Sequence, residues 1–157
     1  MKYTSNSLEE FQKIANEFAE NISSKKDKAT IVGLYGELGA GKTTFTQTVA
    51  KNFGVEEIVT SPTFVIEKIY PVRNDGRKRP ISNGAGEFTH LIHIDAYRLE
   101  KSSELLHLGW QEIISDPHNL ILIEWPEKVA DIMPKHIKIG LKTLENEDSR
   151  SIDISYH

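Results

Sequence analysis

The sequence contains no cysteine, which excludes disulfide scaffolds, thiolate metal sites and cysteine nucleophiles. It also lacks any apolar run near the roughly 20 residues that a membrane-spanning helix requires. Behind Lys2 there is no apolar stretch of the kind that forms a secretory signal. Together these absences predict a cytoplasmic protein that does not engage a membrane.

An excess of positive charge is missing as well. The 157 residues carry 19 Lys and Arg against 23 Asp and Glu, which gives a net charge of −4. A domain that binds nucleic acid by bulk electrostatics is markedly basic, so we do not expect this chain to bind RNA tightly by itself. The hydrophobic fraction of 38% is ordinary for a globular protein, and the length predicts a single domain over residues 1–157.

Alternating helix and strand patterns predict the fold class. Residues 8–21 carry apolar side chains at helical spacing, behind Ser7 and Glu10 in a capping-box pattern. The apolar run 29–35 is typical of a strand buried on both faces. Further strands are expected at 2–4, 64–70, 88–95, 120–124, 137–144 and 151–156, and further helices at 42–53, 102–108 and 110–114. This order predicts a three-layer α/β/α fold, with a mostly parallel sheet that has antiparallel additions.

Residues 71–86 interrupt this alternation. Their sequence, PVRNDGRKRPISNGAG, combines prolines, glycines and basic residues, which predicts a flexible loop insertion. A solvated surface loop and a basic lip that contacts RNA or a partner are both compatible with this composition.

The strongest motif is the segment Gly36–Thr43, GELGAGKT, which matches G-x-x-x-x-G-K-[ST] at every position. A buried strand is expected before it and a helix after it, which is the context of a phosphate-binding loop. Its glycines let the backbone wrap closely around phosphate oxygens, and its amides are expected to point inward at a helix N-terminus. Lys42 is expected to bind the β- and γ-phosphates of a nucleotide, and the Thr43 hydroxyl to bind magnesium.

Two expected strands end in an acid. The runs Leu91–Asp95 and Leu120–Glu124 are apolar up to their last residue, as expected where buried strands meet a phosphate site at their carboxyl ends. Asp95 and Glu124 are therefore candidate partners of a nucleotide-bound metal, and the alternative for each is a capping role at a strand end. His93 shares a face with Asp95 whereas His90 points the other way, which argues against a transition-metal cluster.

A hydroxyl-rich segment, Thr60–Phe64, lies between the phosphate-loop helix and the next strand. Phosphate-loop proteins keep the segment that senses the γ-phosphate at this place. Thr60, Ser61 and Thr63 are therefore candidate switch residues, and an ordinary polar loop is the alternative. Trp125, which follows Glu124 directly, is expected over the nucleotide pocket or in the core.

Four segments occur in a fixed order: Tyr35–Phe45, Ser61–Phe64, His93–Leu99 and Ile123–Glu127. Together they resemble the TsaE (YjeE) family, the ATPases of tRNA threonylcarbamoyladenosine biosynthesis, over nearly the whole chain. The resemblance implies a Mg²⁺-dependent ATP hydrolase that works with TsaB-like and TsaD-like partners. Since no residue is an obvious arginine finger, we expect the chain alone to turn over slowly. TsaD-type proteins modify the adenosine beside the tRNA anticodon, so the resemblance implies contact with tRNA only through these partners.

The resemblance also implies roles for single residues. Lys42 would hold phosphates, Thr43 and Glu124 would hold Mg²⁺, Asp95 would support hydrolysis, and Leu8 would lie near the adenine. The nucleotide-binding residues expected from the motif and the resemblance together are Leu8, Glu37, Leu38, Gly39, Ala40, Gly41, Lys42, Thr43 and Thr44. Either Asp95 or the segment 60–63 would orient the attacking water, and Arg98 is a candidate arginine finger or a surface ion-pair residue.

Three other functions share the phosphate loop. A small-molecule kinase is the main alternative, and it needs an acceptor pocket with lid arginines. A GTPase switch is disfavoured because the sequence has no Asn-Lys-x-Asp segment for reading guanine. A nucleotide-dependent binding module, whose hydrolysis is incidental, is the third alternative.

Overall fold

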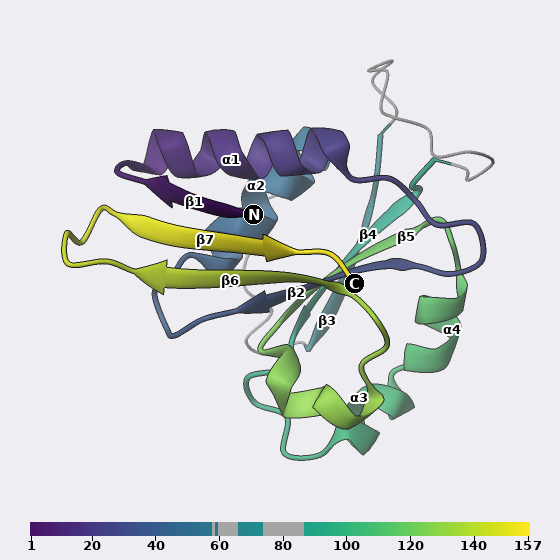
Figure 1. The fold of residues 1–157 in the computed structure, drawn as a ribbon. Coiled ribbons are helices and arrows are strands. Elements are labelled where there is room, and N and C mark those ends of the chain that lie inside the picture. The colour runs from purple at the N-terminus through teal and green to yellow at the C-terminus, as the bar shows by residue number, and fades with distance from the viewer. Residues whose placement is uncertain (58, 60–65, 74–86) are drawn as a thin grey trace.

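The computed structural model describes residues 1–57, 59, 66–73 and 87–157 (Figure 1). Its strands are β1 (Lys2–Ser5), β2 (Thr30–Tyr35), β3 (Glu67–Pro71), β4 (His90–Asp95), β5 (Asn119–Glu124), β6 (Ile137–Thr143) and β7 (Arg150–Ser155). Its helices are α1 (Leu8–Asn21), α2 (Lys42–Asn52), α3 (Ser102–His107), α4 (Trp110–Ser115) and the 3₁₀ helix η1 (Pro126–Ile132). The candidate switch residues Thr60, Ser61 and Thr63 lie outside the described residues.

Within the described residues the strands form one seven-stranded sheet in the order β1-β7-β6-β2-β5-β4-β3. The four central strands β6, β2, β5 and β4 run parallel to one another. The outer strands β7, β1 and β3 each join by antiparallel pairing. The prediction of a mostly parallel sheet with antiparallel additions is confirmed.

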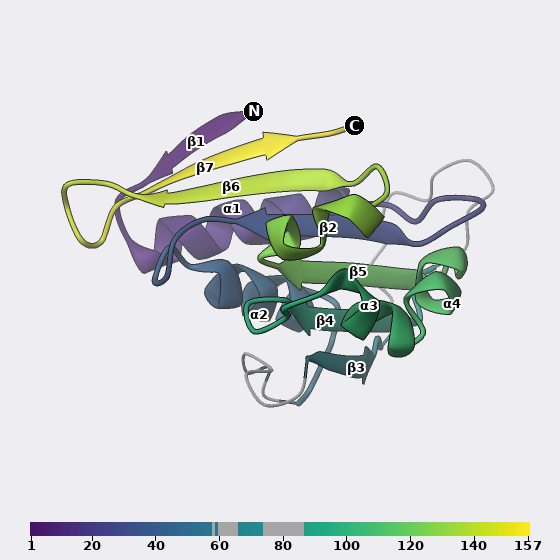
Figure 2. The ribbon, with the colours of Figure 1, turned by 90° about the horizontal axis from the view of Figure 1, so that it is seen from below.

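Helices cover both faces of the sheet (Figures 1 and 2). On one face α1 and α2 bury a cluster in which Phe45 lies between Phe11 and Phe18, with ring centroids 6.0 and 5.6 Å away. On the other face α3, α4 and η1 pack over a second cluster around the fully buried Trp110. The three-layer α/β/α prediction is confirmed. Among the described helices, none combines the length and the apolar character needed to cross a bilayer.

The start of α1 differs in one detail from the capping-box prediction. The Ser7 hydroxyl accepts from the Glu10 amide at 3.2 Å, as expected. The Glu10 carboxylate, however, accepts from the backbone N–H of Asn6 at 2.6 Å rather than from that of Ser7. Both bonds still satisfy backbone donors at the helix entrance, so the first turn of α1 is fixed close to the phosphate loop.

The loop predicted from residue 71 begins later than its composition indicated. Pro71 is the last residue of β3 and lies opposite His90 of β4. The Val72 amide then donates to Thr89 O at 2.9 Å, and Arg73 pairs with Glu56 at 2.6 Å. Proline is tolerated here because β3 is the edge strand of the sheet. On its open side no neighbouring strand needs a hydrogen bond from the N–H that proline lacks. Residues 74–86 of the predicted insertion lie outside the described residues.

Candidate nucleotide and metal site

The phosphate loop connects β2 to α2, as the motif predicted. Two of its glycines are required by geometry. Gly36 has φ +145° and a Cβ there would lie 2.3 Å from Leu141 O, while Gly41 has φ +106° and a Cβ would lie 3.0 Å from the Phe11 ring. The loop therefore fits tightly between the β6 backbone and α1, which fixes the direction of its amides.

Lys42 lies inside the loop that it follows. Its Nζ donates to Gly36 O at 2.5 Å and to Glu37 O at 2.9 Å, and it lies 4.0 Å from the centroid of the Trp125 ring. Burial lowers the pKa of Lys42 from its ordinary 10.5, against the opposing field of nearby acids, Glu124 foremost. Both hydrogen bonds go to neutral carbonyls, so the loop holds the cation where an anion can bind it at little cost in reorganisation.

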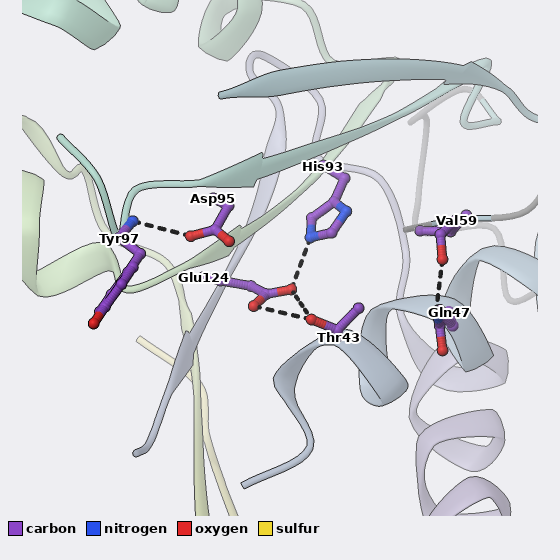
Figure 3. A network of polar contacts seen from close by, with 7 residues as sticks. All are labelled: Thr43, Gln47, Val59, His93, Asp95, Tyr97 and Glu124. Carbon is purple, nitrogen blue, oxygen red and sulfur yellow. Dashed lines mark hydrogen bonds and ion pairs between the residues drawn. The ribbon is translucent and has the colours of Figure 1, made fainter. Parts of the chain in front are cut away.

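Thr43 and Glu124 meet across 81 residues of sequence, as predicted. The Thr43 hydroxyl donates to Glu124 at 2.9 Å from Oε1 and 3.3 Å from Oε2. On its other side Oε1 lies 2.9 Å from His93 Nε2 (Figure 3). Glu124 is only 3% exposed, so its carboxylate is held by these neighbours.

Asp95 reaches the same place from the adjacent strand. The parallel register places it opposite Glu124, at the carboxyl ends of β4 and β5. Its Oδ1 accepts from the Tyr97 amide at 2.9 Å (Figure 3), so it caps the turn after β4 as well as facing the site. The structure shows the capping bond directly, and it places Asp95 on the wall of the cavity that holds Lys42 and Thr43.

Trp125 adopts a left-handed backbone conformation with φ +57° directly after Glu124. Its amide donates to Leu34 O at 3.3 Å, and its ring lies 5.0 Å from that of Tyr97. The turn places the partly buried indole beside Lys42 on the wall of the site, where it also packs against the second core cluster. The position over the pocket and the contact with the core, which the sequence left open as alternatives, are therefore both present.

Two cavities meet at the loop. A cavity of about 320 Å³ holds Lys42 and Thr43 together with both candidate acids. A second, of about 240 Å³, is bounded by Leu8, Gly41 and Thr44. The remaining predicted nucleotide residues that line one or both cavities are Leu38 and Gly39.

Two predicted nucleotide residues line neither cavity. Glu37 contributes its backbone carbonyl to Lys42, and its side chain is exposed. Ala40 is buried, and its Cβ lies 3.1 Å from where a Cβ on Gly36 would stand. Glu37 and Ala40 therefore shape the loop from outside the cavities.

Sequence reasoning did not place the turn between β6 and β7, or Arg150 that follows it, at the site. Glu147, Asp148 and Arg150 line the second cavity, and Arg150 Nη2 donates to Gly39 O at 3.3 Å. The turn is polar and has no motif. Only the antiparallel pairing of β6 with β7, next to β2, brings it to the phosphate loop.

The donor set fits magnesium. Within the described residues no group of three or more His, Cys, Asp or Glu side chains is arranged to hold a metal ion. One carboxylate and one hydroxyl, Glu124 and Thr43, are instead the oxygen donors that Mg²⁺ takes when nucleotide phosphates and water complete its octahedron. This arrangement fits a metal that arrives with a nucleotide.

A family model described as "Threonylcarbamoyl adenosine biosynthesis protein TsaE" matches residues 5–152. The chain belongs to the TsaE family. The chain is therefore a protein of tRNA threonylcarbamoyladenosine biosynthesis. The resemblance inferred from the four ordered motifs is confirmed.

Individual relatives agree. The TsaE protein of Rickettsia prowazekii is 36% identical over 146 residues, which are 92% of this chain and 88% of that protein. The TsaE protein of Bacillus subtilis is 37% identical over 123 residues, 78% of this chain and 66% of that protein. The crystal structure of YdiB from Bacillus subtilis superposes with a TM-score of 0.68 at 28% identity, and covers 97% of this chain and 82% of that one. The phosphate-loop NTPase fold expected for a TsaE member is confirmed.

Proposed function

We propose that this TsaE-family chain is a Mg²⁺-dependent ATPase, a single catalytic unit over residues 1–157. The observation that carries the proposal is the bond from Thr43 to Glu124 beside the buried Lys42. That geometry joins a phosphate-binding cation to a pair of magnesium donors in one cavity.

The roles follow from position. Lys42 and the amides of the loop bind the β- and γ-phosphates, and they neutralise charge on the γ-phosphate as its bond to the β-phosphate oxygen breaks. Thr43 and Glu124 would hold the Mg²⁺, which would supply further neutralisation of the phosphate charge. Either Asp95 or the segment 60–63 orients the attacking water, and the position of Asp95 on the cavity wall supports its candidacy. Water adds its oxygen to the γ-phosphorus, and ADP and inorganic phosphate leave.

The cellular setting of the proposal comes from the family. The chain acts with TsaB-like and TsaD-like proteins in the cytoplasm, and tRNA is held by those partners. The net charge of −4 supports the assignment of tRNA binding to the partners, because a domain that binds RNA by itself requires positive charge. Exchange of ATP for ADP would then alter how the chain contacts its partners.

The test is turnover and product analysis with γ-labelled ATP. Lys42→Ala and Glu124→Ala are each expected to lower turnover roughly 10²–10³-fold, the loss typical when one preorganised charge contact is removed. Lys51→Ala, at the exposed end of the same helix, is the matched control and should turn over like the wild type. The label should appear only in inorganic phosphate.

Two results would contradict the proposal. Wild-type turnover in either site variant, measured with the partners present, refutes the assignment of the site. Label on a second small molecule would instead establish the kinase alternative.

A further inference from the structure

His93 is a fully buried histidine that the proposed function leaves unused. It is 0% exposed in the middle of the sheet, and its Nε2 lies 2.9 Å from Glu124 Oε1. Both partners are buried, with side-chain exposures of 0% and 4%. A buried polar group that lacks a hydrogen-bond partner costs free energy. The way in which His93 and Glu124 pair therefore shows how the fold satisfies both groups.

The sheet register explains how His93 reaches Glu124. β4 and β5 are parallel, with His93 opposite Leu122 and Asp95 opposite Glu124. Alternation along β4 gives His93 the same face as Leu91, which packs in the cluster under α1 and α2. The imidazole therefore approaches the carboxylate from the sheet, while Thr43 approaches it from the first turn of α2 (Figure 3).

The hydrogen bonds of the His93 imidazole show which ring nitrogen carries the proton. A carboxylate accepts only, so in the bond with Glu124 the His93 Nε2 carries the hydrogen. His93 Nδ1 is buried and has no hydrogen-bond partner among the described residues. At this buried position, an unpaired lone pair on Nδ1 costs less free energy than an unpaired N–H donor would. Both ring nitrogens thus point to the same Nε2–H tautomer.

The two oxygens of Glu124 are consequently unequal. Oε1 accepts from both His93 and Thr43 at 2.9 Å, whereas the one contact of Oε2 among the described residues is that with Thr43 at 3.3 Å. Oε2 is therefore the oxygen with accepting capacity left for a cation. Thr43 donates its hydrogen to the carboxylate, so its oxygen lone pairs also stay available to a cation.

We infer that His93 is a positioning residue for the magnesium ligand: it fixes Oε1 of Glu124 and so presents Oε2 and the Thr43 oxygen to the cation. The inference rests on the proposed function, because it assigns a role within the same site. Groups that orient a metal ligand in this way typically change metal affinity 10–100-fold when they are removed.

The test compares two amides of different reach. His93→Gln places an amide N–H about where Nε2 stands, and His93→Asn places it about where Nδ1 stands, short of Glu124. Both remove the ring and both bury an amide, so a merely structural role affects them alike. His118→Asn, on an exposed histidine at the opposite end of β5, is the control.

The readout is a calorimetric Mg²⁺ titration at fixed ADP, together with ADP binding in EDTA. In His93→Asn we expect the half-saturating Mg²⁺ concentration to rise roughly 10–100-fold, and in His93→Gln to stay within about threefold of wild type. Metal-free ADP affinity should be unchanged in both variants. Equal Mg²⁺ titrations for wild type and His93→Asn overturn the inference, and so do equal losses in the two amide variants.

A metal-free measurement covers the case in which His93→Asn fails to fold. Nitrogen-15 chemical shifts of the imidazole in the wild-type protein should report the Nε2–H tautomer, and an Nδ1–H ring overturns the inference by itself. Failure of the proposed function has a different signature. In that case the wild type shows no Mg²⁺-dependent nucleotide binding at all, whatever the tautomer of His93.

Discussion

At the scale of single residues, two glycines of the phosphate loop differ in how tightly the surrounding structure constrains them. Gly36 and Gly39 both have positive φ, +145° and +77°. A Cβ on Gly36 would stand 2.3 Å from Leu141 O, whereas a Cβ on Gly39 would meet nothing within 4 Å among the described residues. The motif predicts a glycine at 36 and leaves position 39 variable, and the spacing to β6 gives the physical reason.

These two glycines yield a matched prediction for stability. Gly39→Ala should lower the free energy of unfolding by about 1–2 kcal/mol, the cost of a left-handed backbone at a residue with a Cβ. Gly36→Ala should cost more, because the backbone carbonyl of Leu141 has to move as well. Urea unfolding of both variants measures the difference. Equal losses would contradict the close approach of the loop to β6.

Some residues of the candidate site could be predicted from the sequence, and others could not. Lys42, Thr43 and Glu124 were predictable because each belongs to a motif with a chemical reason. The partner of Glu124 was not, since His93 could equally support the site or pack in the core until the register of β4 and β5 was known. Arg150 carried no signal, because only three-dimensional pairing brings it near Gly39.

At the scale of elements, long amphipathic patterns with end signals were predicted best. The bounds of α1 and α2 follow from apolar spacing and from the residues at their ends: Ser7 caps the start of α1, and Gly54, with a positive φ of +73°, follows the end of α2. The 3₁₀ helix η1 was missed, because it begins at a proline behind the left-handed Trp125 and lacks a helical apolar period. Strand order was not predictable either, because β1 and β7 pair across the length of the chain.

The junction of β2 and β6 gives a prediction on pH. His136, just before β6, donates from Nδ1 to Pro134 O at 2.7 Å and accepts at Nε2 from the Tyr35 hydroxyl at 2.8 Å. Burial lowers the pKa of His136 from its ordinary 6.5; the bond to Pro134 O opposes this shift, and the nearby Lys138, His157 and Lys25 reinforce it. The unfolded chain then binds more protons than the fold as pH falls below about 6.5, so this group makes stability decrease there.

The measurement is the urea midpoint between about pH 5.5 and pH 7.5, the range in which a histidine of ordinary or lowered pKa titrates. His136→Gln should have a smaller decline at the acid end than wild type, because the group that gains a proton on unfolding is gone. His118→Gln, at an exposed site, should keep the wild-type slope. A wild-type slope in His136→Gln would show that His136 is not held neutral by burial.

At the scale of the whole molecule, the site draws on elements that are remote in sequence. The phosphate loop starts at β2, the acids end β4 and β5, and the second cavity lies between α1 and the turn that joins β6 to β7. A nucleotide bound there would contact segments that belong to both faces of the sheet and to both ends of the chain. Binding at such a site stabilises the fold as a unit rather than one local segment.

We therefore expect a global thermal shift from Mg²⁺-nucleotide. At 100 times its dissociation constant a ligand adds about 2.7 kcal/mol, which corresponds to roughly 5–10 °C in Tm for a domain of this size. The same shift should appear by circular dichroism and by Trp fluorescence, because the transition is cooperative. Lys42→Ala should abolish most of the shift, while Lys51→Ala should retain it. A shift seen by fluorescence alone would mean that nucleotide orders only the surroundings of Trp125 and leaves the sheet unaffected.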